Sequence, residues 1–459
     1  KNYSLPIPYL LHLLYSHYSY ISIQSIIIMA RINSLSLATG KYKKIMVYSH
    51  DAFGLGNIRR MIAICQYLLT SVPNLSILLL SGSPMLQSFR LPIGLDYIKL
   101  PCLNRGRSGK IAVKYLNTDI ESTLNLRSEL ILAAARNYRP DLVLVDKKPS
   151  GIKGELNLAI NYLQSNLPAT KFVLLLRDIL DTPEKTIAEW QREDYYRQVE
   201  SIYDRLLVVG MPEIFDLCRE YQFSQAMSSA SSPIADKVRY CGYIRKESGL
   251  KSKFTVRQEL GISDDEKLVL VTPGGGEDGY YLISNYLEGL KRQSDLFNSS
   301  KVYSLIFCGT EMPIPQQQQV HQQAAKCSGV TVLEFTNDMM SYINTADVVI
   351  SMCGYNTITE VLQHRKKAIA VPRIKPGREQ LIRAQSLQQA GLIEMIHPEE
   401  LNSDLLIETL FNHLKKLNKS NDLFQLDFDG LSRASDYLAM LLFKSFEFSP
   451  EQAAVLKSA

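Results

Sequence analysis

Three glycine-containing stretches combine a turn with polar side chains that could bind or transform a ligand. HDAFGLGNIRR (50–60) follows the apolar run IMVY, TPGGGEDGYYLIS (272–284) follows KLVLV, and CGYNTITEVL (353–362) comes shortly after DVVIS. Each pattern predicts a strand that turns into a helix, where backbone N–H groups and the helix dipole favour an anion such as phosphate. Glycine lets the backbone approach such a ligand closely. The three stretches therefore predict ligand sites at strand ends.

The first turn differs from the dinucleotide fingerprint G-x-G-x-x-G. Gly54 and Gly56 supply two glycines, but Arg59 stands at the third position, and no acidic residue follows about 20 residues later to bind a ribose. A nicotinamide-dependent dehydrogenase is therefore disfavoured. The turn either serves packing alone or lets backbone N–H groups approach a ligand at a helix N-terminus.

The later turns carry acidic residues that allow more than one interpretation. Glu277 and Asp278 would repel a phosphate unless they point outward. Glu360 fits a capping box with Thr357, with Asn356 or Thr357 as the helix cap and Glu360 in the first turn. The same carboxylate could instead accept hydrogen bonds from both hydroxyls of a ribose. Three neighbouring polar residues follow: Arg378, Glu379 and Gln380. They form either a solvated helix start or a set of hydrogen-bond partners for sugar hydroxyls.

The elements that must position these residues are short apolar runs alternating with amphipathic stretches. Nearly continuous apolar runs are typical of strands buried on both faces of a parallel sheet. They occupy residues 45–48, 75–80, 142–146, 171–176 and 205–210, and then, after a lapse around 238–249, residues 267–272, 302–309, 330–335, 347–351 and 367–372. The pattern predicts two doubly wound α/β domains with a boundary near residue 240.

The same pattern divides the whole chain into four segments. We expect an N-terminal extension (1–40), a first Rossmann-like domain (41–240), a second Rossmann-like domain (241–415) and a C-terminal tail with a helix (416–459). The Gln-rich stretch at 316–323 is expected to be a solvated helix start. The first 28 residues suit neither a transmembrane helix nor a signal peptide, so three alternatives stay open: translation from Met29, a disordered tail, or a weak membrane-surface segment.

Composition excludes several classes of protein. The 459 residues are 46% hydrophobic and 21% charged, which suits two globular domains. The net charge of +5 is scattered except in a basic loop at 99–114, which argues against nucleic-acid binding. Seven cysteines without a C-x-x-C pair argue against disulfides and zinc, and favour a reducing, cytoplasmic compartment.

In combination, these motifs resemble those of a known family. The glycine turn at 274–276, the segment EFTNDMMSYINTADVVIS, the stretch CGYNTITEVL and the pattern P-x-x-x-x-x-REQ-x-x-RA are similar to the C-terminal domain of family 28 glycosyltransferases. HDAFGLGNIRR, DKKPSGIKGEL and LRDILD resemble a bacterial group described only as glycosyltransferases. The resemblance covers residues 41–415 and implies the GT-B fold, with two Rossmann-like domains facing a central cleft.

The resemblance implies a donor site in the second domain. Phe335 and Thr336 would lie against the base of a nucleoside diphosphate sugar, Glu360 would bind its ribose, and Glu379 and Gln380 would face the sugar. The implied donor is UDP-linked, with neither cofactor nor metal. The remaining residues assigned to the donor are Gly274, Gly275, Gly276, Gly354, Asn356, Thr357, Arg378 and, as a phosphate partner, Arg245.

The opening motif departs from the family. The residue after the second glycine is usually His, but Asn57 stands here, and an amide cannot take a proton near neutral pH. His50 and Asp51 are then the candidate general bases, since imidazole titrates near neutral pH. Two alternatives stay open: His50 is a strand-end histidine with a structural role, or activity is lost.

The acceptor is expected on the first domain, at the ends of its strands. The acceptor is either a small molecule or lipid-linked. In the second case the basic 99–114 loop could meet it at the inner membrane face, whereas the alternative, a solvated loop, is slightly favoured. The D-F-D at 427–429 is interpreted as a turn, without a metal. The residues assigned to the acceptor side are Gly54, Gly56, Asp146, Lys148, Glu155, Arg177 and Asp178, with Lys147, Ser150, Gly151 and Asp181 in the same loops.

The sequence thus predicts an inverting, metal-independent glycosyltransferase. Two alternatives stay open: a sugar-nucleotide epimerase or hydrolase on the same fold, and a non-catalytic protein that binds a sugar nucleotide.

Overall fold

A computed structural model describes residues 42–50, 56–105, 111–224, 233–246, 249–415 and 426–443. Within these ranges the chain forms two compact units. One contains residues up to Leu176, 197–207 and those from Leu431 onward, and the other contains 177–196 and 208–430. The predicted extension 1–40, together with Asp51 and Gly54, lies outside the described residues.

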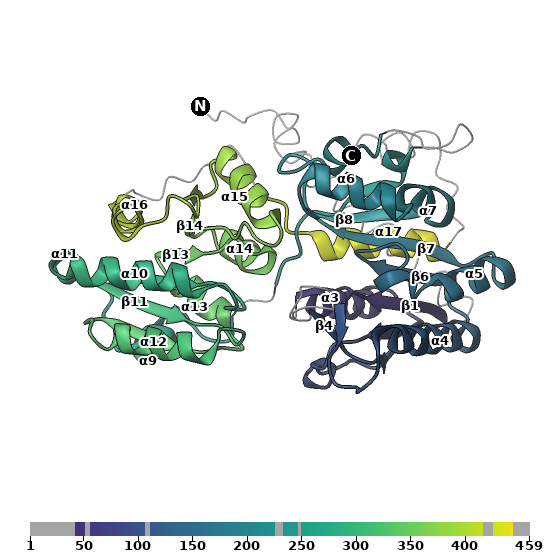
Figure 1. Cartoon of the computed structure of the whole chain (residues 1–459), viewed down its shortest axis with the longest axis horizontal. Helices are drawn as coiled ribbons and strands as arrows, with labels where there is room; N and C mark the ends of the chain where they lie inside the picture. The colour runs from purple at the N-terminus through teal and green to yellow at the C-terminus, as the bar shows by residue number, and fades with distance from the viewer. Residues whose placement is uncertain are drawn as a thin grey trace, which may run out of the picture. The chain divides into compact units, whose positions relative to one another are not determined.

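The first sheet is built on strands that are almost entirely apolar. Ile45, Met46 and Val47 of its central strand are at most 1% exposed, because helices cover both faces. β1 pairs in parallel with the strands on either side, Ile45 lying opposite Ile77 and Leu142. The sheet has the order β3-β2-β1-β6-β7-β8-β9, with β1 (Lys43–Ser49), β2 (Leu75–Ser81), β3 (Leu95–Lys99), β6 (Leu142–Asp146), β7 (Lys171–Arg177), β8 (Arg205–Val209) and β9 (Val238–Tyr240) (Figure 1).

Capping residues set the limits of several helices that accompany this sheet. Asp119 accepts a hydrogen bond from the Ser122 N–H at the start of α4, and Thr182 precedes Pro183 at the start of α6. The helices are α3 (Gly56–Ser71), α4 (Ile120–Tyr138), α5 (Asn157–Asn166), α6 (Pro183–Arg192), α7 (Tyr195–Ile202), α8 (Leu217–Glu220) and α17 (Gly430–Leu442).

The basic segment 99–114 contains an antiparallel hairpin of β4 (Leu103–Arg105) and β5 (Ile111–Val113), although residues 106–110 are not described. Its apolar residues explain the difference from the predicted loop, because Leu103 packs with buried Ile152 while Ile111 and Val113 are partly buried.

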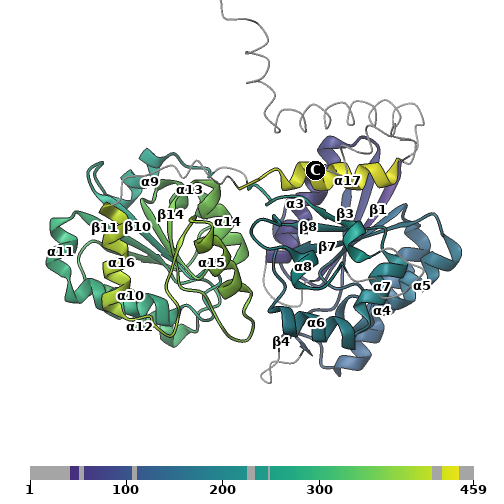
Figure 2. The same cartoon turned by 90° about the horizontal axis from the view of Figure 1, so that it is seen from above.

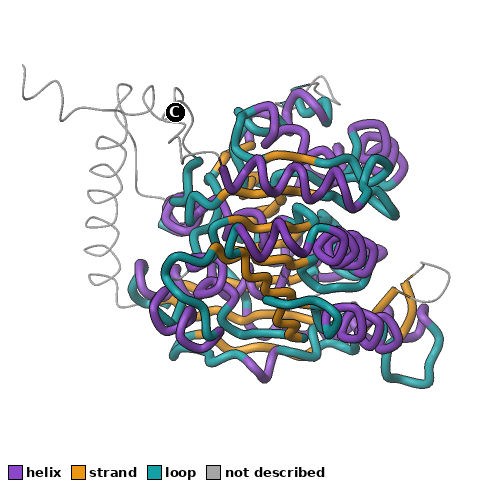
Figure 3. Tube along the Cα trace, turned by 90° about the vertical axis from the view of Figure 1, so that its left-hand side faces the viewer, coloured by secondary structure: helices purple, strands orange, loops and turns teal. Residues whose placement is uncertain are grey.

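The second sheet is also parallel throughout its pairs. Its order is β12-β11-β10-β13-β14-β15, with β10 (Lys267–Thr272), β11 (Val302–Phe307), β12 (Val330–Leu333), β13 (Val348–Ser351), β14 (Lys367–Ala370) and β15 (Glu394–Met395). Figure 3 shows the strands lying between helices. This doubly wound arrangement places the carboxyl ends of the strands along one edge, where such sheets bind ligands.

Two apolar clusters cover the faces of this sheet. One contains side chains of α10 (Tyr280–Arg292), α12 (Ile314–Ala324) and α16 (Ser403–Lys415), and the other contains side chains of α9 (Lys253–Leu260), α13 (Met339–Thr345), α14 (Tyr355–Gln363) and α15 (Glu379–Gln389). α11 (Ser294–Ser299) precedes β11. Figure 2 shows α9 and α13 on one side of the strands and α10 and α12 on the other.

All the predicted apolar runs contain strands, whereas the short strands β3, β9 and β15 were missed. The Gln-rich stretch occupies most of α12 rather than only its start. The predicted domain boundary near 240 directly follows β9, while the second compact unit also includes 177–196 and 208–240. Among the described residues, no helix has the length and apolar character needed to cross a membrane.

Candidate functional site

The strand-end loops of the second sheet are tied to one another by backbone hydrogen bonds. The Glu311 N–H donates to the Gly275 carbonyl at 2.8 Å, and the Gly309 N–H donates to the Glu334 carbonyl at 2.9 Å. These bonds join the loops after β10, β11 and β12 into one rim, next to the loops after β13 and β14.

The three-glycine turn is required by close backbone packing. Gly274 and Gly276 have φ of +83° and +97°, and a methyl group on Gly276 would lie 2.2 Å from the Cys308 carbonyl oxygen. Gly274 and Gly275 are exposed, and α10 begins after Gly279 without a side-chain cap. The turn therefore serves packing and also leaves an uncapped helix start beside exposed backbone, as an anion site requires.

Arg373, which the sequence analysis did not single out, places a positive charge beside the acidic side chains near this turn. Arg373, in the loop after β14, donates to Asp278 at 3.3 Å and to Glu379 at 3.1 Å, and its N–H donates to the Gln380 side chain at 3.0 Å. Burial lowers the pKa of Arg373, but Glu379 and Asp278 together raise it above its ordinary value. The predicted repulsion between Asp278 and a phosphate is thus offset. The only signal in the sequence that could have indicated Arg373 was the presence of a basic residue in a strand-end loop.

The start of α14 corrects one prediction. The helix begins at Tyr355, and its cap is Gly354, which has extended backbone and makes no side-chain cap bond. Asn356 and Thr357 lie inside the first turn, so the expectation that either caps the helix is wrong. Glu360 lies in the second turn, too far along for a capping box. Thr-x-x-Glu fits a helix interior as readily as a helix start, which is why the pattern misled.

Glu360 has a different partner, Lys246. The Lys246 Nζ donates to Glu360 Oε1, and the two side chains are 29% and 10% exposed. Gln363, one turn further along α14, bonds both the N–H and the carbonyl of Lys246, at 2.9 and 2.8 Å. Glu360 Oε2 has no hydrogen-bond partner among the described residues. It is therefore the oxygen available to a ligand hydroxyl.

Arg245, the predicted phosphate partner, makes a different contact. It is exposed, and its guanidinium lies 5.7 Å from the centre of the Phe428 ring. Its role at a phosphate stays a prediction.

Phe335 offers an exposed aromatic surface on the same rim. It is 48% exposed, although it is large and apolar. The next residue, Thr336, accepts the Asp338 N–H at 3.0 Å and so stabilises the turn that carries Phe335. An exposed ring on an ordered turn is suited to stacking against a flat group.

The predicted bases on the first sheet lie in a polar network. His50 is 5% exposed, its N–H donates to Asp146 at 3.3 Å, and its carbonyl accepts from the Asn57 amide at 2.7 Å. Arg60, missed by the sequence analysis, donates to Asp146 at 2.8 Å and to Asn57 at 3.1 Å. The structure therefore brings His50, Asn57 and Asp146 together, with Asn57 holding the backbone of His50.

Glu155 lies in a separate buried network. Its oxygens accept from Arg127 at 2.6 and 2.8 Å and from the Tyr48 hydroxyl at 2.5 Å, and it is 3% exposed. Burial and the adjacent Glu155 hold the pKa of Tyr48 well above its ordinary value, against the opposing effect of Arg127. Contact between Glu155 and an acceptor stays a prediction, but the carboxylate is enclosed by the protein.

The other residues assigned to the acceptor side have mixed surroundings. Lys147 and Lys148 are partly buried in the loop after β6, while Ser150 and Gly151 are buried. Gly56 is the first residue of α3. Arg177 is partly buried, whereas Asp178 is 1% exposed and binds Arg383 with both oxygens.

The D-F-D segment lies immediately before α17. The Asp427 carbonyl accepts the Tyr243 N–H at 2.7 Å, and Asp429 forms an antiparallel bridge with Ile244. The Asp429 N–H also donates to Asp427 Oδ1 at 2.9 Å, a local hydrogen bond typical of an Asx turn. Among the described residues, no group of His, Cys, Asp and Glu side chains is arranged to hold a metal.

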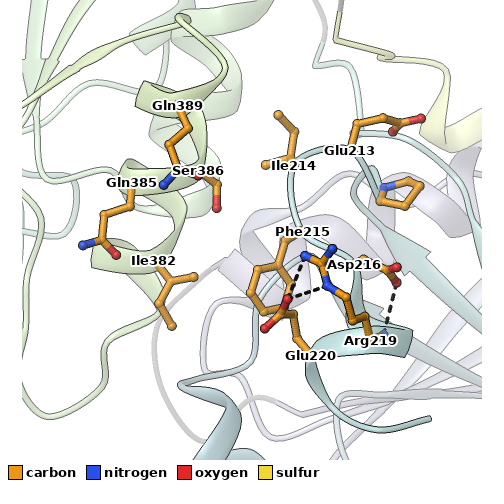
Figure 4. A pocket seen from close by; sticks show the side chains of 11 residues that line it. Glu213, Ile214, Phe215, Asp216, Arg219, Glu220, Ile382, Gln385, Ser386 and Gln389 are labelled. Atoms are coloured by element: carbon orange, nitrogen blue, oxygen red, sulfur yellow. Dashed lines mark hydrogen bonds and ion pairs between the residues drawn. The ribbon is translucent and has the colours of Figure 1, made fainter. Parts of the chain in front are cut away.

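An open pocket of about 470 Å³ is lined partly by α15, the helix that begins with Glu379 and Gln380. Figure 4 shows Ile382, Gln385 and Ser386 of α15 on one side of it and the segment around Phe215 on the other. Asp216 and Arg219 in this pocket are engaged in contacts with neighbouring protein groups. None of the residues assigned to the donor lines it.

The residues that form the rim lie within a match to a known family. Residues 270–427 match the profile of the Glycosyltransferase family 28 C-terminal domain. This part of the chain is similar to a family 28 C-terminal domain, and the protein is family 28-like. The matched residues contain the glycine turn, Phe335, Glu360 and the segment around Gln380.

Curated relatives agree with this assignment over part of their length. The chain is 28% identical over 166 residues to an uncharacterized glycosyltransferase of Methanopyrus kandleri, covering 36% of this chain and 43% of that protein. It is 27% identical over 181 residues to the UDP-N-acetylglucosamine–N-acetylmuramyl-(pentapeptide) pyrophosphoryl-undecaprenol N-acetylglucosamine transferase of Clostridium kluyveri, covering 39% and 46%. The matches thus span about half the length of these relatives.

Solved structures show the fold. MurG of Acinetobacter baumannii superposes with a TM-score of 0.50 at 15% identity, covering 88% of this chain and 99% of that one. A protein of Listeria monocytogenes described as a putative UDP-N-acetylglucosamine 2-epimerase gives a TM-score of 0.59 at 13% identity, covering 89% of this chain and 98% of that one. Two Rossmann-like domains of the GT-B type are therefore confirmed.

Proposed function

We propose that this protein transfers a sugar from a UDP-sugar to an acceptor hydroxyl. The observation that carries the proposal is Glu360, paired through Oε1 alone with Lys246, in the domain whose rim also presents Phe335 and the exposed glycine turn. Glu360 Oε2 would accept from the ribose, the Phe335 ring would stack on the base, and the uncapped start of α10 would hold the diphosphate.

The proposed reaction is a direct displacement that inverts the anomeric carbon. The acceptor oxygen forms a bond to that carbon, the bond to the diphosphate breaks, and the acceptor proton passes to a base. His50, whose backbone is held by Asp146 and Asn57, is the proposed base. The leaving diphosphate gains charge, which backbone N–H groups and the nearby cations Lys246 and Arg373 would stabilise without a metal.

The class of acceptor is inferred from one of the relatives. The Clostridium kluyveri relative is named for a lipid-linked acceptor. We propose either a lipid-linked acceptor, which would bring the protein to the cytoplasmic face of a membrane, or a small cytoplasmic one.

Thermal unfolding with UDP, UDP-N-acetylglucosamine, GDP and NAD tests the donor. A ligand at about 100 times its dissociation constant adds about 2.7 kcal/mol of stability. We expect stabilisation by the uridine compounds, which Glu360→Gln should lose and Glu259→Gln should keep. Glu259 is a matched control because it pairs with Lys251 at 2.7 Å on the surface. Stabilisation by NAD alone, or by none of the four, would contradict the proposal.

A second proposed function is epimerisation or hydrolysis of the same donor, favoured by the structural likeness to the epimerase. Formation of a new sugar nucleotide or of free sugar, with no acceptor present, would support it. Stabilisation by UDP compounds without turnover under any condition would instead indicate a non-catalytic binding protein.

A further inference from the structure

Both acidic side chains of the LRDILD motif bind the segment REQLIRA, about 200 residues later. Asp181 accepts the Arg378 N–H at 3.0 Å. Asp178 accepts from Arg383 Nε and Nη2 at 2.8 and 2.9 Å. Arg378 immediately precedes α15 and Arg383 lies in its second turn, so the two carboxylates hold the start of this helix at two points. Residues 177–196 and α15 belong to the same compact unit.

Arg383 also fixes the loop that precedes α14. Its Nη1 donates to the Cys353 carbonyl at 3.1 Å. Cys353 has φ of +58°, a conformation that a residue other than glycine rarely adopts, and Gly354 follows it as the cap of α14. One guanidinium therefore links the helix that carries Glu379 and Gln380 to the helix that carries Glu360.

A second group of contacts holds the loop between β14 and α15. Lys185 pairs with Asp181 and also donates to the Pro376 carbonyl at 3.3 Å. A methyl group on Gly377 would lie 2.6 Å from Glu379 Oε2 and 3.3 Å from Asp181 Oδ2, so no side chain fits between these carboxylates. On the other side, Arg373 bonds Glu379 and Gln380. Both residues assigned to the donor sugar are thus enclosed by fixed partners.

The burial of the Asp178–Arg383 pair argues for a geometric role. Their side chains are 2% and 1% exposed. A buried ion pair adds little net stability compared with apolar side chains of the same volume, whereas its directed hydrogen bonds impose one geometry. Asp178 also has no exposed oxygen for a substrate, which disfavours the acceptor role that the sequence predicted.

We propose that Asp178 and Asp181 are positioning residues for the donor sugar, which act through Arg383 and Arg378 on the segment that contains Glu379 and Gln380. This proposal rests on the proposed function, because it takes the sugar of a UDP-sugar as the ligand of that segment. Under this proposal, the LRDILD motif contributes to binding of the donor sugar, whereas the sequence analysis assigned it to the acceptor.

The test compares the dissociation constants of UDP and UDP-N-acetylglucosamine by titration calorimetry. For Asp181→Ala we expect a rise of at least about fivefold for the UDP-sugar and less than about twofold for UDP. Asp347→Ala is the matched control, since Asp347 likewise accepts a backbone N–H, that of Leu268 at 2.9 Å, and pairs with Lys267 at 3.7 Å. The control should change neither constant.

Variants at the buried pair give an independent test. Asp178→Asn and Arg383→Met should each cause the same selective loss, and the double variant should lose no more than either single one, because all three break one interaction. An equal weakening of UDP and UDP-sugar, as a general structural defect would cause, would overturn the proposal. So would unchanged affinity for both ligands in Asp181→Ala, which keeps the test valid if the buried variants do not fold.

Hydrogen exchange separates this proposal from the proposed function. In Asp181→Ala without ligand, the amides of residues 373–383 should exchange faster than in the wild type, and those around Asp347 should not. If the wild type binds no uridine compound, the proposed function is wrong. Unchanged exchange at 373–383 would show instead that Asp181 does not hold this segment.

Discussion

Lys246 and Glu360 form an ion pair in which the Glu360 side chain is only 10% exposed. Because Gln363 bonds both backbone groups of Lys246, the lysine is held at the helix that carries its partner. The pair orients the carboxylate through Oε1, with Oε2 left to a ligand.

Lys246→Met should weaken UDP binding and lower stability. Loss of the cation leaves Glu360 Oε1 with an unmet hydrogen-bonding requirement, at a cost of about 1–3 kcal/mol in unfolding free energy. Urea unfolding and calorimetry with UDP measure the two effects. The double variant Lys246→Met/Glu360→Gln should regain part of the stability but no UDP affinity. UDP affinity equal to that of the wild type in Lys246→Met would show that the pair has no part in the donor site.

The glycine turn provides a prediction with a control one residue away. Gly276→Ala combines positive φ with a methyl group 2.2 Å from the Cys308 carbonyl oxygen, whereas a methyl group on Gly275 would make an ordinary 3.7 Å contact with Glu311. We expect Gly276→Ala to lower the unfolding free energy by at least about 2 kcal/mol. Gly275→Ala should lower it far less in the same urea titration. Equal effects of the two variants would contradict the packing described for this turn.

Glu155 is expected to be a stability residue. Its side chain and that of Arg127 are at most 1% exposed, so Glu155→Gln leaves a buried cation without its counter-charge. The expected loss is about 3–5 kcal/mol in unfolding free energy. Glu129→Gln, at an exposed position of the same helix as Arg127, should change it by less than about 0.5 kcal/mol. A stable Glu155→Gln variant that loses only acceptor binding would restore the acceptor role predicted from sequence.

The lowered pKa of Lys366 determines how this residue's contribution to the unfolding free energy varies with pH. Burial, with a contribution from Lys253, lowers the pKa of Lys366 from 10.5 to about 8 in the folded protein. Between these values the unfolded chain binds more protons at this residue than the folded protein, so its contribution to stability rises with pH. The unfolding free energy of the wild type minus that of Lys366→Met should therefore increase from pH 8 to 10.5. A difference that is constant or falls over this range would be inconsistent with a lowered pKa.

The fold was largely predictable because strands buried on both faces must be apolar along their whole length. Runs such as LVLVD and KLVLV meet that requirement. Strands β3, β9 and β15 do not, since they are short and contain polar residues, so periodicity gives them little signal.

The site was less predictable, because its polar contacts join residues far apart in the chain. The sequence indicated Glu360 and the glycine turn as strand-end groups. Lys246, Arg373 and the pairing of Asp178 with Arg383 depend on which loops meet in space, and the last pair is separated by 205 residues. Spacing also could not distinguish a capping box from a helix interior at Glu360.

Hydrogen exchange with and without UDP-N-acetylglucosamine tests the central claim most directly. We expect slower exchange in the loops around Gly275, Phe335, Gly354 and Gln380, and no such change in Glu360→Gln at the same ligand concentration. Protection confined to other segments, such as the pocket around Phe215, or no protection at all, would contradict a nucleotide-sugar site on this rim.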